Sequence, residues 1–283
     1  MLTTFINTIT KGDVAGLQHK LLHSTCWSQH LHKAYGAGQI KNRLICLFQQ
    51  FGKCTIEESF ELKSDNEHII CLSIKPEKAQ SSVHYILWLE TNGQVIKSID
   101  AMLDTMKLDC INKHSKKTIL NTLPTPDAFI LHDYDQQNHL QCELATPTNI
   151  ANISDKLASL LDAWWSIWSA AQLSKIDSIY EKQANIILSG HEDAIKPSAL
   201  FEFVMNKYVH LSRIFCQIEK VIVDKGQVAV KWYLDGDENG KRIRVPYVSI
   251  LSFKEGKINQ DITIADLCAH KKRYPESDLY SHC

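Results

Sequence analysis

Residues 214–264 read IFCQIEKVIVDKGQVAVKWYLDGDENGKRIRVPYVSILSFKEGKINQDITI, and no other stretch of the chain is as informative about the fold. Apolar and polar residues alternate along it, and three polar turn sequences interrupt the alternation at 224–226, 235–240 and 254–256. A period of two predicts strands, and short turns rich in Gly, Asn and Asp predict hairpins between them. The stretch therefore predicts four antiparallel strands, at 214–224, 227–234, 245–253 and 257–264.

Helical spacing precedes these strands. Residues 153–169 carry apolar side chains three and four positions apart, and Ser154 is a candidate N-cap. Two further helices are predicted, at 173–187 and from Pro197 onward. Helices followed by consecutive hairpin strands are typical of an α+β domain, with the helices covering one face of a curved sheet.

The N-terminal half shows the same order, with helical stretches at 5–22 and 39–51 followed by four strand-like stretches at 55–62, 68–74, 83–89 and 94–101. A shift of 159 residues pairs Gly12 with Ala171, and a shift of 163 pairs Tyr85 with Val248. The difference falls in one hairpin loop, where a structural repeat tolerates insertions. We interpret the halves as tandem copies; the alternative is two unrelated α+β domains. The predicted domains are 1–108 and 151–270, with a linker at 109–150 and a frayed polar tail at 271–283.

Composition limits the partners and the compartment. The 283 residues include 31 basic and 32 acidic side chains, so no polybasic surface for nucleic acid or membrane is expected. No apolar run reaches the roughly eighteen residues of a membrane span, and residues 1–10 lack the features of a signal peptide. The nine cysteines form no CxxC pair and are interpreted as reduced thiols of a cytoplasmic protein.

Three features carry a family resemblance: the hairpin that ends at 253–258, Asp266 ten residues after Gly256, and the phrase Gly12-Asp-Val-Ala-Gly16-Leu17. They resemble the nuclear transport factor 2-like superfamily, with the SnoaL-like branch closest. The resemblance implies two cone-shaped domains, each with N-terminal helices packed on a curved antiparallel sheet. It also implies pairing through the outer sheet faces, here within one monomeric chain. Isomerases, cyclases, dehydratases, hydrolases and inactive members share this scaffold, so fold alone does not assign the function.

The resemblance also allows a test of catalytic positions. In the ketosteroid-isomerase branch a carboxylate base follows the inter-helix turn, and the corresponding positions here hold Gln29 and Leu188. Neither side chain can accept a proton usefully, which favours a protein without that activity. His30 is the substitute base nearest these positions. Among acids on the final strands, Asp266 is the catalytic candidate, with a capping role as its alternative, whereas Asp261 is predicted to face solvent or a domain interface.

Aromatic residues gather in the second half. The candidate ligand-binding residues are Trp164, Trp168, Tyr180, Tyr208 and Trp232. They could line an apolar pocket for a planar molecule, or they could simply fill the core. The 13 histidines match no metal-ligand spacing, and no phosphate-binding loop or nucleophile motif is present, so neither a metal nor a cofactor is predicted.

These observations predict a non-catalytic module that binds a hydrophobic small molecule or another partner. One alternative is a SnoaL-like isomerase or cyclase that acts on a hydrophobic carbonyl compound. A second alternative is a purely structural pairing scaffold.

Overall fold

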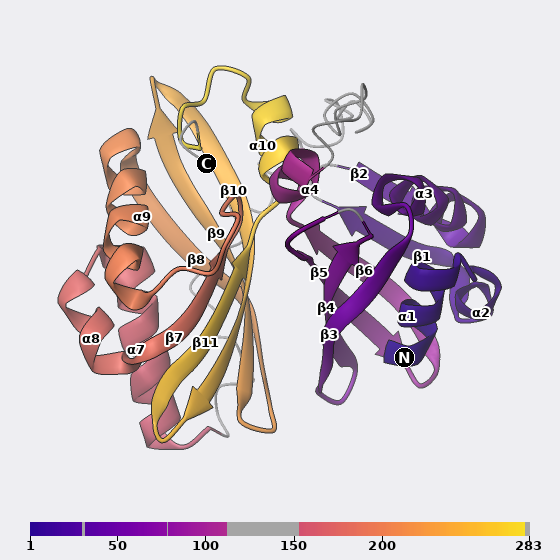
Figure 1. Cartoon of the computed structure of the whole chain (residues 1–283), viewed down its shortest axis with the longest axis horizontal. Coiled ribbons are helices and arrows are strands. Elements are labelled where there is room, and N and C mark those ends of the chain that lie inside the picture. The colour runs from indigo at the N-terminus through magenta and orange to yellow at the C-terminus, as the bar shows by residue number, and fades with distance from the viewer. Residues whose placement is uncertain (30–31, 78, 112–152, 281–283) are drawn as a thin grey trace. The chain divides into compact units, whose positions relative to one another are not determined.

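The computed structural model describes residues 1–29, 32–77, 79–111 and 153–280. The chain divides into two compact units, Met1–Cys142 and Glu143–Cys283, which are described one at a time (Figure 1). In each unit, helices pack on a curved sheet, so the predicted α+β class is confirmed.

The first unit contains a six-stranded sheet in the order β2-β1-β6-β5-β4-β3. Its neighbouring strands are antiparallel except for β1 and β6, which are parallel. Its elements are α1 (Leu2–Lys11), α2 (Ala15–Gln18), β1 (Leu21–Gln29), β2 (His32–Tyr35), α3 (Gly36–Phe51), β3 (Cys54–Lys63), β4 (Glu67–Pro76), β5 (Val83–Asn92), β6 (Val95–Leu103) and α4 (Thr105–Ile111).

The second unit contains a five-stranded sheet in the order β7-β11-β10-β9-β8, again with one parallel pair, β7 and β11. Once β2 is set aside, the two sheets have the same strand order and directions. Its elements are α7 (Asp155–Ala170), η2 (Leu173–Lys175), α8 (Ile176–Ile179), β7 (Tyr180–Leu188), α9 (Pro197–His210), β8 (Ser212–Asp224), β9 (Gln227–Glu238), β10 (Lys241–Lys254), β11 (Lys257–Ile264) and α10 (Leu267–Arg273).

The ends of the first helix in each unit support the predicted repeat. Both α1 and α7 end at a residue in the left-handed conformation, Gly12 (φ 66°) and Ala171 (φ 49°). A left-handed residue is a common way to end a helix. These are the two residues that the shift of 159 pairs. At the other end of α7, the Ser154 hydroxyl accepts a hydrogen bond from the Leu157 amide, as an N-cap does.

The shift of 163 is wrong by one residue. Gly93 (φ 61°) and Glu255 (φ 50°) each directly follow the first strand of the last hairpin, β5 and β10, which makes the shift 162. Tyr85 therefore corresponds to Tyr247, and Asp104 to Asp266. Successive strand residues point to opposite faces, so an error of one residue assigns every side chain to the wrong face.

Two helix predictions are also wrong. The stretch 173–187 is helical only to Ile179, and 180–188 forms the edge strand β7. Ala184, Ile186 and Leu188 are buried at alternate positions, which is the period of a strand. In the same way, the helical stretch predicted at 5–22 ends at Gln18, before β1. Both sheets are mixed, because β1 is parallel to β6 and β7 is parallel to β11. The sequence predicts helix for most of β7, and it predicts no strand at β1.

The C-terminal segment is not frayed as predicted. Residues 267–273 form α10, and Leu279 and Tyr280 are buried. The amide of Asp278 donates a hydrogen bond to Glu238 on β9, which ties this segment to the hairpin. Within the described ranges, no helix combines the length and the apolarity that a membrane span requires.

Candidate functional site

Tryptophan rings lie between α7 and the inner face of the second sheet. Trp164 and Trp168 lie four residues apart on α7 and contact Trp232 of β9, with ring centroids 6.3 and 5.4 Å away. The Trp232 ring stacks on Tyr247 of β10 at 4.4 Å. All four side chains are buried. Two of the predicted ligand-binding residues on α7 and one on β9 are thus in mutual contact.

A chain of hydrogen bonds runs behind these rings. Trp232 Nε1 donates to Ser249 Oγ at 2.9 Å, and the hydroxyls of Ser249 and Thr263 lie 2.8 Å apart. The Thr263 hydroxyl then donates to Asp261 Oδ1 at 2.7 Å. The chain therefore ends on a carboxyl group with no exposed surface.

The other oxygen of Asp261 receives two more donors. Tyr180 Oη donates to Oδ2 at 2.5 Å, and Trp164 Nε1 donates to it at 3.0 Å. Tyr180 lies at the start of β7 and Trp164 on α7, so three elements converge on one carboxyl group. Neighbouring donors favour the charged form, but burial outweighs them and raises the pKa of Asp261. Burial and the nearby carboxyl also raise the pKa of Tyr180.

The prediction that Asp261 faces solvent or an interface is wrong, and the reason is a β-bulge. The pairing of β10 with β11 runs from Ser252–Gln260 to Phe253–Ile258, so Asn259 is an extra residue. Counting forward from Ile258 without this bulge assigns Asp261 to the outer face. With the bulge included, Asp261 lies on the same inner face as Thr263 and Ile258.

The other predicted site residues are placed as follows. Tyr208 of α9 is partly buried and donates a hydrogen bond to the Trp168 carbonyl at 3.1 Å. Gln29 and Leu188 are buried at the ends of β1 and β7, and Gln29 Oε1 accepts from Arg43 Nη2 at 3.2 Å. His30 lies outside the described residues.

Asp266 directly follows β11 and caps α10. Its carboxylate accepts a hydrogen bond from the Ala269 amide at 3.0 Å. Asp104 does the same for Lys107 after β6, at 3.1 Å. The equivalent acids of the two units thus have the same local geometry. Each carboxylate caps the helix that follows it, as the alternative prediction for Asp266 states.

We expect Asp266→Ala to lower the free energy of unfolding of the second unit by about 1–2 kcal/mol, because the first turn of α10 loses its acceptor. Asp266→Asn keeps a side-chain oxygen at the cap, so its free energy of unfolding should fall by only about 0.3 kcal/mol. Urea unfolding of both variants measures the difference. Equal losses for Ala and Asn would contradict a capping role.

Lys207 was missed by the sequence analysis. It lies on the buried side of α9, and only 3% of it is exposed. Its Nζ is 3.7 Å from the centroid of the Phe203 ring and 5.1, 5.5 and 6.0 Å from those of Tyr280, Tyr247 and Trp168. Its spacing in the sequence could have indicated that it is buried. Lys207 occurs three residues after Val204 and seven after Leu200, which are both core residues on the same helix face.

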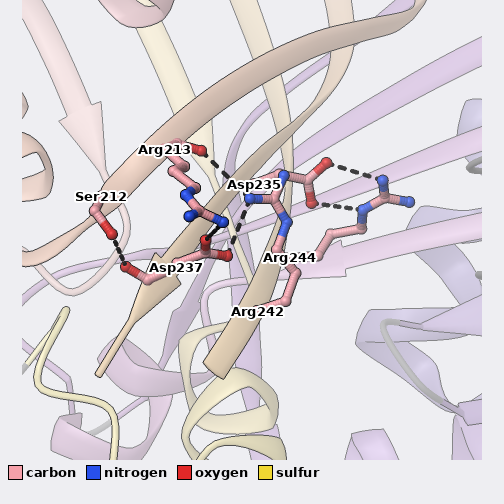
Figure 2. Close-up of polar contacts among 6 residues, drawn as sticks. All are labelled: Ser212, Arg213, Asp235, Asp237, Arg242 and Arg244. Atoms are coloured by element: carbon pink, nitrogen blue, oxygen red, sulfur yellow. Dashed lines mark hydrogen bonds and ion pairs between the residues drawn. The ribbon is translucent and has the colours of Figure 1, made fainter. Parts of the chain in front are cut away.

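A second polar cluster lies where β8, β9 and β10 begin or end (Figure 2). Arg244 binds Asp235 through two contacts, Nε to Oδ1 at 2.7 Å and Nη2 to Oδ2 at 2.9 Å. Asp237 lies between Arg242 and Arg213, at 3.2 and 3.6 Å. Asp235 and Asp237 alternate with Leu234 and Gly236, so they lie on the sheet face opposite Trp232. These charges satisfy one another and hold the long hairpin together.

The first unit has apolar residues at the positions of the Asp261 network. Strand register defines the correspondence: Leu87 pairs with Ala101 as Ser249 pairs with Thr263, and Leu72 pairs with Tyr85 as Trp232 pairs with Tyr247. By the same register, Ile99 corresponds to Asp261 and Leu21 to Tyr180. The shift of 159 places Phe5 at the position of Trp164. These first-unit residues belong to one hydrophobic core or pack against it.

No group of three or more His, Cys, Asp or Glu side chains in the described segments is arranged to hold a metal ion.

Comparison with known proteins finds a similarity to one family within the second unit. Residues 161–260 match the family model described as a SnoaL-like domain. A search of the curated proteins finds no match.

The chain is also similar to several solved structures. One is a proposed polyketide cyclase from Bacillus cereus, with 20% identity and a TM-score of 0.38 over 42% of this chain and 80% of that one. A second is a proposed polyketide cyclase from Acidithiobacillus ferrooxidans, with 14% identity and a TM-score of 0.39 over 44% of this chain and 99% of that one. A third is IdmH from Streptomyces antibioticus, with 9% identity and a TM-score of 0.38 over 43% of this chain and 99% of that one.

Proposed function

Since residues 161–260 form a SnoaL-like domain, as the resemblance predicted, we propose that the second unit binds a small hydrophobic molecule. The binding region is the space between α7, α9 and the inner face of the second sheet. The rings of Trp168, Trp232 and Tyr247 supply the apolar walls, and the Asp261 network supplies hydrogen bonds for a carbonyl or hydroxyl group.

One observation carries this proposal: the second unit keeps a buried polar network where the first unit has apolar residues. Burying a hydroxyl or indole N–H gains little net stability even when it is hydrogen-bonded, and burying a carboxyl group costs several kcal/mol before its partners offset the loss. Phe5, Leu21, Ile99 and Ala101 demonstrate that the same topology can close without these groups. The polar residues are therefore not needed for folding, which supports a role in binding.

The buried acid also supports a second candidate, a SnoaL-like isomerase or cyclase. Tyr180 and Asp261 are 2.5 Å apart in a site without exposed surface, and burial raises the pKa of both groups. A pair of weak acids held in this way can donate hydrogen bonds to a carbonyl oxygen as it gains negative charge. This function requires a base that the described residues do not identify, so binding is the preferred function.

We further propose that the first unit is a second copy of this domain with a closed interior. The shared strand order and the two left-handed helix ends support this proposal. Its domain would span 1–108 and that of the second unit 151–270, paired within one chain. Sedimentation should then give the mass of a monomer, and a tight homodimer would contradict internal pairing.

The binding proposal is tested by giving the second unit the residues of the first. The variant combines Trp164→Phe, Tyr180→Leu, Asp261→Ile and Thr263→Ala, and it should unfold in urea at or above the wild-type midpoint. It should also lose at least about ten-fold in affinity for 2-acetonaphthone, a planar ketone, because the hydrogen bonds of the network are gone. Quenching of tryptophan fluorescence measures binding.

Native mass spectrometry of fresh wild-type protein is the companion measurement. A small molecule that is retained by the wild type and absent from the four-residue variant would support the proposal. Wild-type protein that retains no molecule and binds no 2-acetonaphthone would contradict it.

A further inference from the structure

Lys207 occupies a core position of α9. The buried stripe of this helix consists of Leu200, Val204, Lys207 and the following Leu211. In the first unit, the stripe of α3 has the same spacing and consists of Ile40, Leu44, Leu47 and Phe51. Lys207 therefore takes the place of Leu47. The helix packs well with leucine there, so a lysine is not required by the fold.

Aromatic rings replace much of the hydration that this ammonium group loses. Phe203 from α9, Trp168 from α7, Tyr247 from β10 and Tyr280 from the C-terminal segment surround Nζ at 3.7–6.0 Å from their centroids. Each such contact is worth about 0.5–2 kcal/mol, whereas burying a charge costs several. The rings therefore keep a cation inside the unit and next to the Trp232–Tyr247 stack.

Two buried nitrogens beside this cage have no hydrogen-bond partner among the residues that the structure describes: Trp168 Nε1 and His270 Nδ1. The Trp168 ring is itself a wall of the cage, and His270 lies against Tyr280 at 5.3 Å. An indole N–H can only donate, whereas His270 Nε2 already lies 3.3 Å from Ser277 Oγ, so Nδ1 donates in one tautomer and accepts in the other. A buried indole N–H is normally satisfied, so Trp168 Nε1 points to an absent acceptor.

The positive charge of Lys207 contributes to lowering the pKa of two neighbouring histidines, His191 and His270. Burial, and to a lesser extent this charge, lowers the pKa of His191. For His270 burial has the largest effect, followed by the charges of Arg273 and Lys207, and its pKa falls to about 4. Both imidazoles are therefore neutral near pH 7, so neither adds a positive charge beside Lys207.

We propose that the second unit takes a planar organic anion, such as an aromatic carboxylate or a stabilised enolate, and that Lys207 pairs with its negative group. This inference rests on the proposed function and adds a charge preference to it. The planar body would lie against Trp168, Trp232 and Tyr247. The anionic oxygens would accept hydrogen bonds from Lys207 Nζ and from the unpartnered donor on Trp168.

Two probes of nearly equal shape test the proposal: 2-naphthoate carries a carboxylate where 2-acetonaphthone carries an acetyl group. The wild type should bind 2-naphthoate at least about ten-fold more tightly, as one charge-assisted hydrogen bond predicts. Lys207→Met should bring the two affinities within about two-fold of each other, because the charge that distinguishes the two probes is removed. Lys207→Arg keeps the charge and should retain the preference.

Lys231→Met is the matched control. Lys231 is the other buried lysine of this sheet region, but it lies on the opposite face of β9 and pairs with Glu219 at 3.1 Å. This variant should keep the wild-type preference. Equal wild-type affinities for the two probes, or a preference that survives Lys207→Met, would overturn the inference and leave the proposed function standing. No binding of either probe to the wild type would overturn the proposed function itself.

Discussion

Asp261→Ala should lower the free energy of unfolding of the second unit by about 3 kcal/mol or more. The side chain accepts hydrogen bonds from Tyr180, Trp164 and Thr263, and all three donors are buried away from the solvent. Each buried donor left without a partner costs about 1–3 kcal/mol, and the cavity left by the carboxyl group adds to the loss.

Urea unfolding followed by tryptophan fluorescence measures this loss. The signal reports mainly on the second unit, because four of the six tryptophans lie on α7 and β9. Asp261→Asn is the control, since its amide oxygen still accepts and the Thr263 hydroxyl can rotate to accept from its amide nitrogen. It should lose about 1 kcal/mol. A loss below about 1 kcal/mol for Asp261→Ala would mean that the three donors find other partners.

The second large effect is an acid-dependent loss of stability through His270. Burial is the main cause that lowers its pKa from the ordinary 6.5 to about 4, so the folded protein holds it neutral. Between these pH values the unfolded chain binds a proton that the folded chain does not. Stability is therefore fully present above about pH 6.5 and falls as the pH drops toward 4, by about 3 kcal/mol in total.

His270→Phe removes the titrating group and keeps a ring against Tyr274 and Tyr280. We expect the stability of this variant, relative to the wild type, to rise by about 2–3 kcal/mol between pH 7 and pH 4.5. Urea midpoints at four pH values in this range give the difference. The comparison cancels the opposite contribution of Asp261, whose raised pKa favours the folded state at low pH. A difference that does not change with pH would show that His270 titrates normally.

The sequence predicted the elements whose pattern is local. The hairpins of 214–264 follow from alternation and turn residues, and α7 follows from apolar spacing and the Ser154 cap. The strand β7 was missed because Ile176, Ile179, Tyr180 and Ala184 follow a helical spacing that runs from α8 into the strand. Pairing with β11 decides between helix and strand, and that contact is not visible in a short window of sequence.

The candidate site was predicted only in part, for the same reason. Aromatic enrichment pointed to Trp164, Trp168 and Trp232, which do meet. Strict alternation along the last strand wrongly predicted that Asp261 points outward, because a single bulged residue at Asn259 changes the face of the strand. Lys207 was overlooked since a lysine on a helix is ordinarily exposed.

By itself the sequence determined the class of the fold and the repeated order of helices and hairpins, because apolar period, caps and turns act over a few residues. Only the tertiary structure decided which polar groups meet. Tyr180 and Trp164 reach Asp261 across 81 and 97 residues of chain, and Tyr280 closes the cage around Lys207 from the C-terminal segment. Such contacts depend on strand register and on packing between distant elements, and a shift of one residue reverses them.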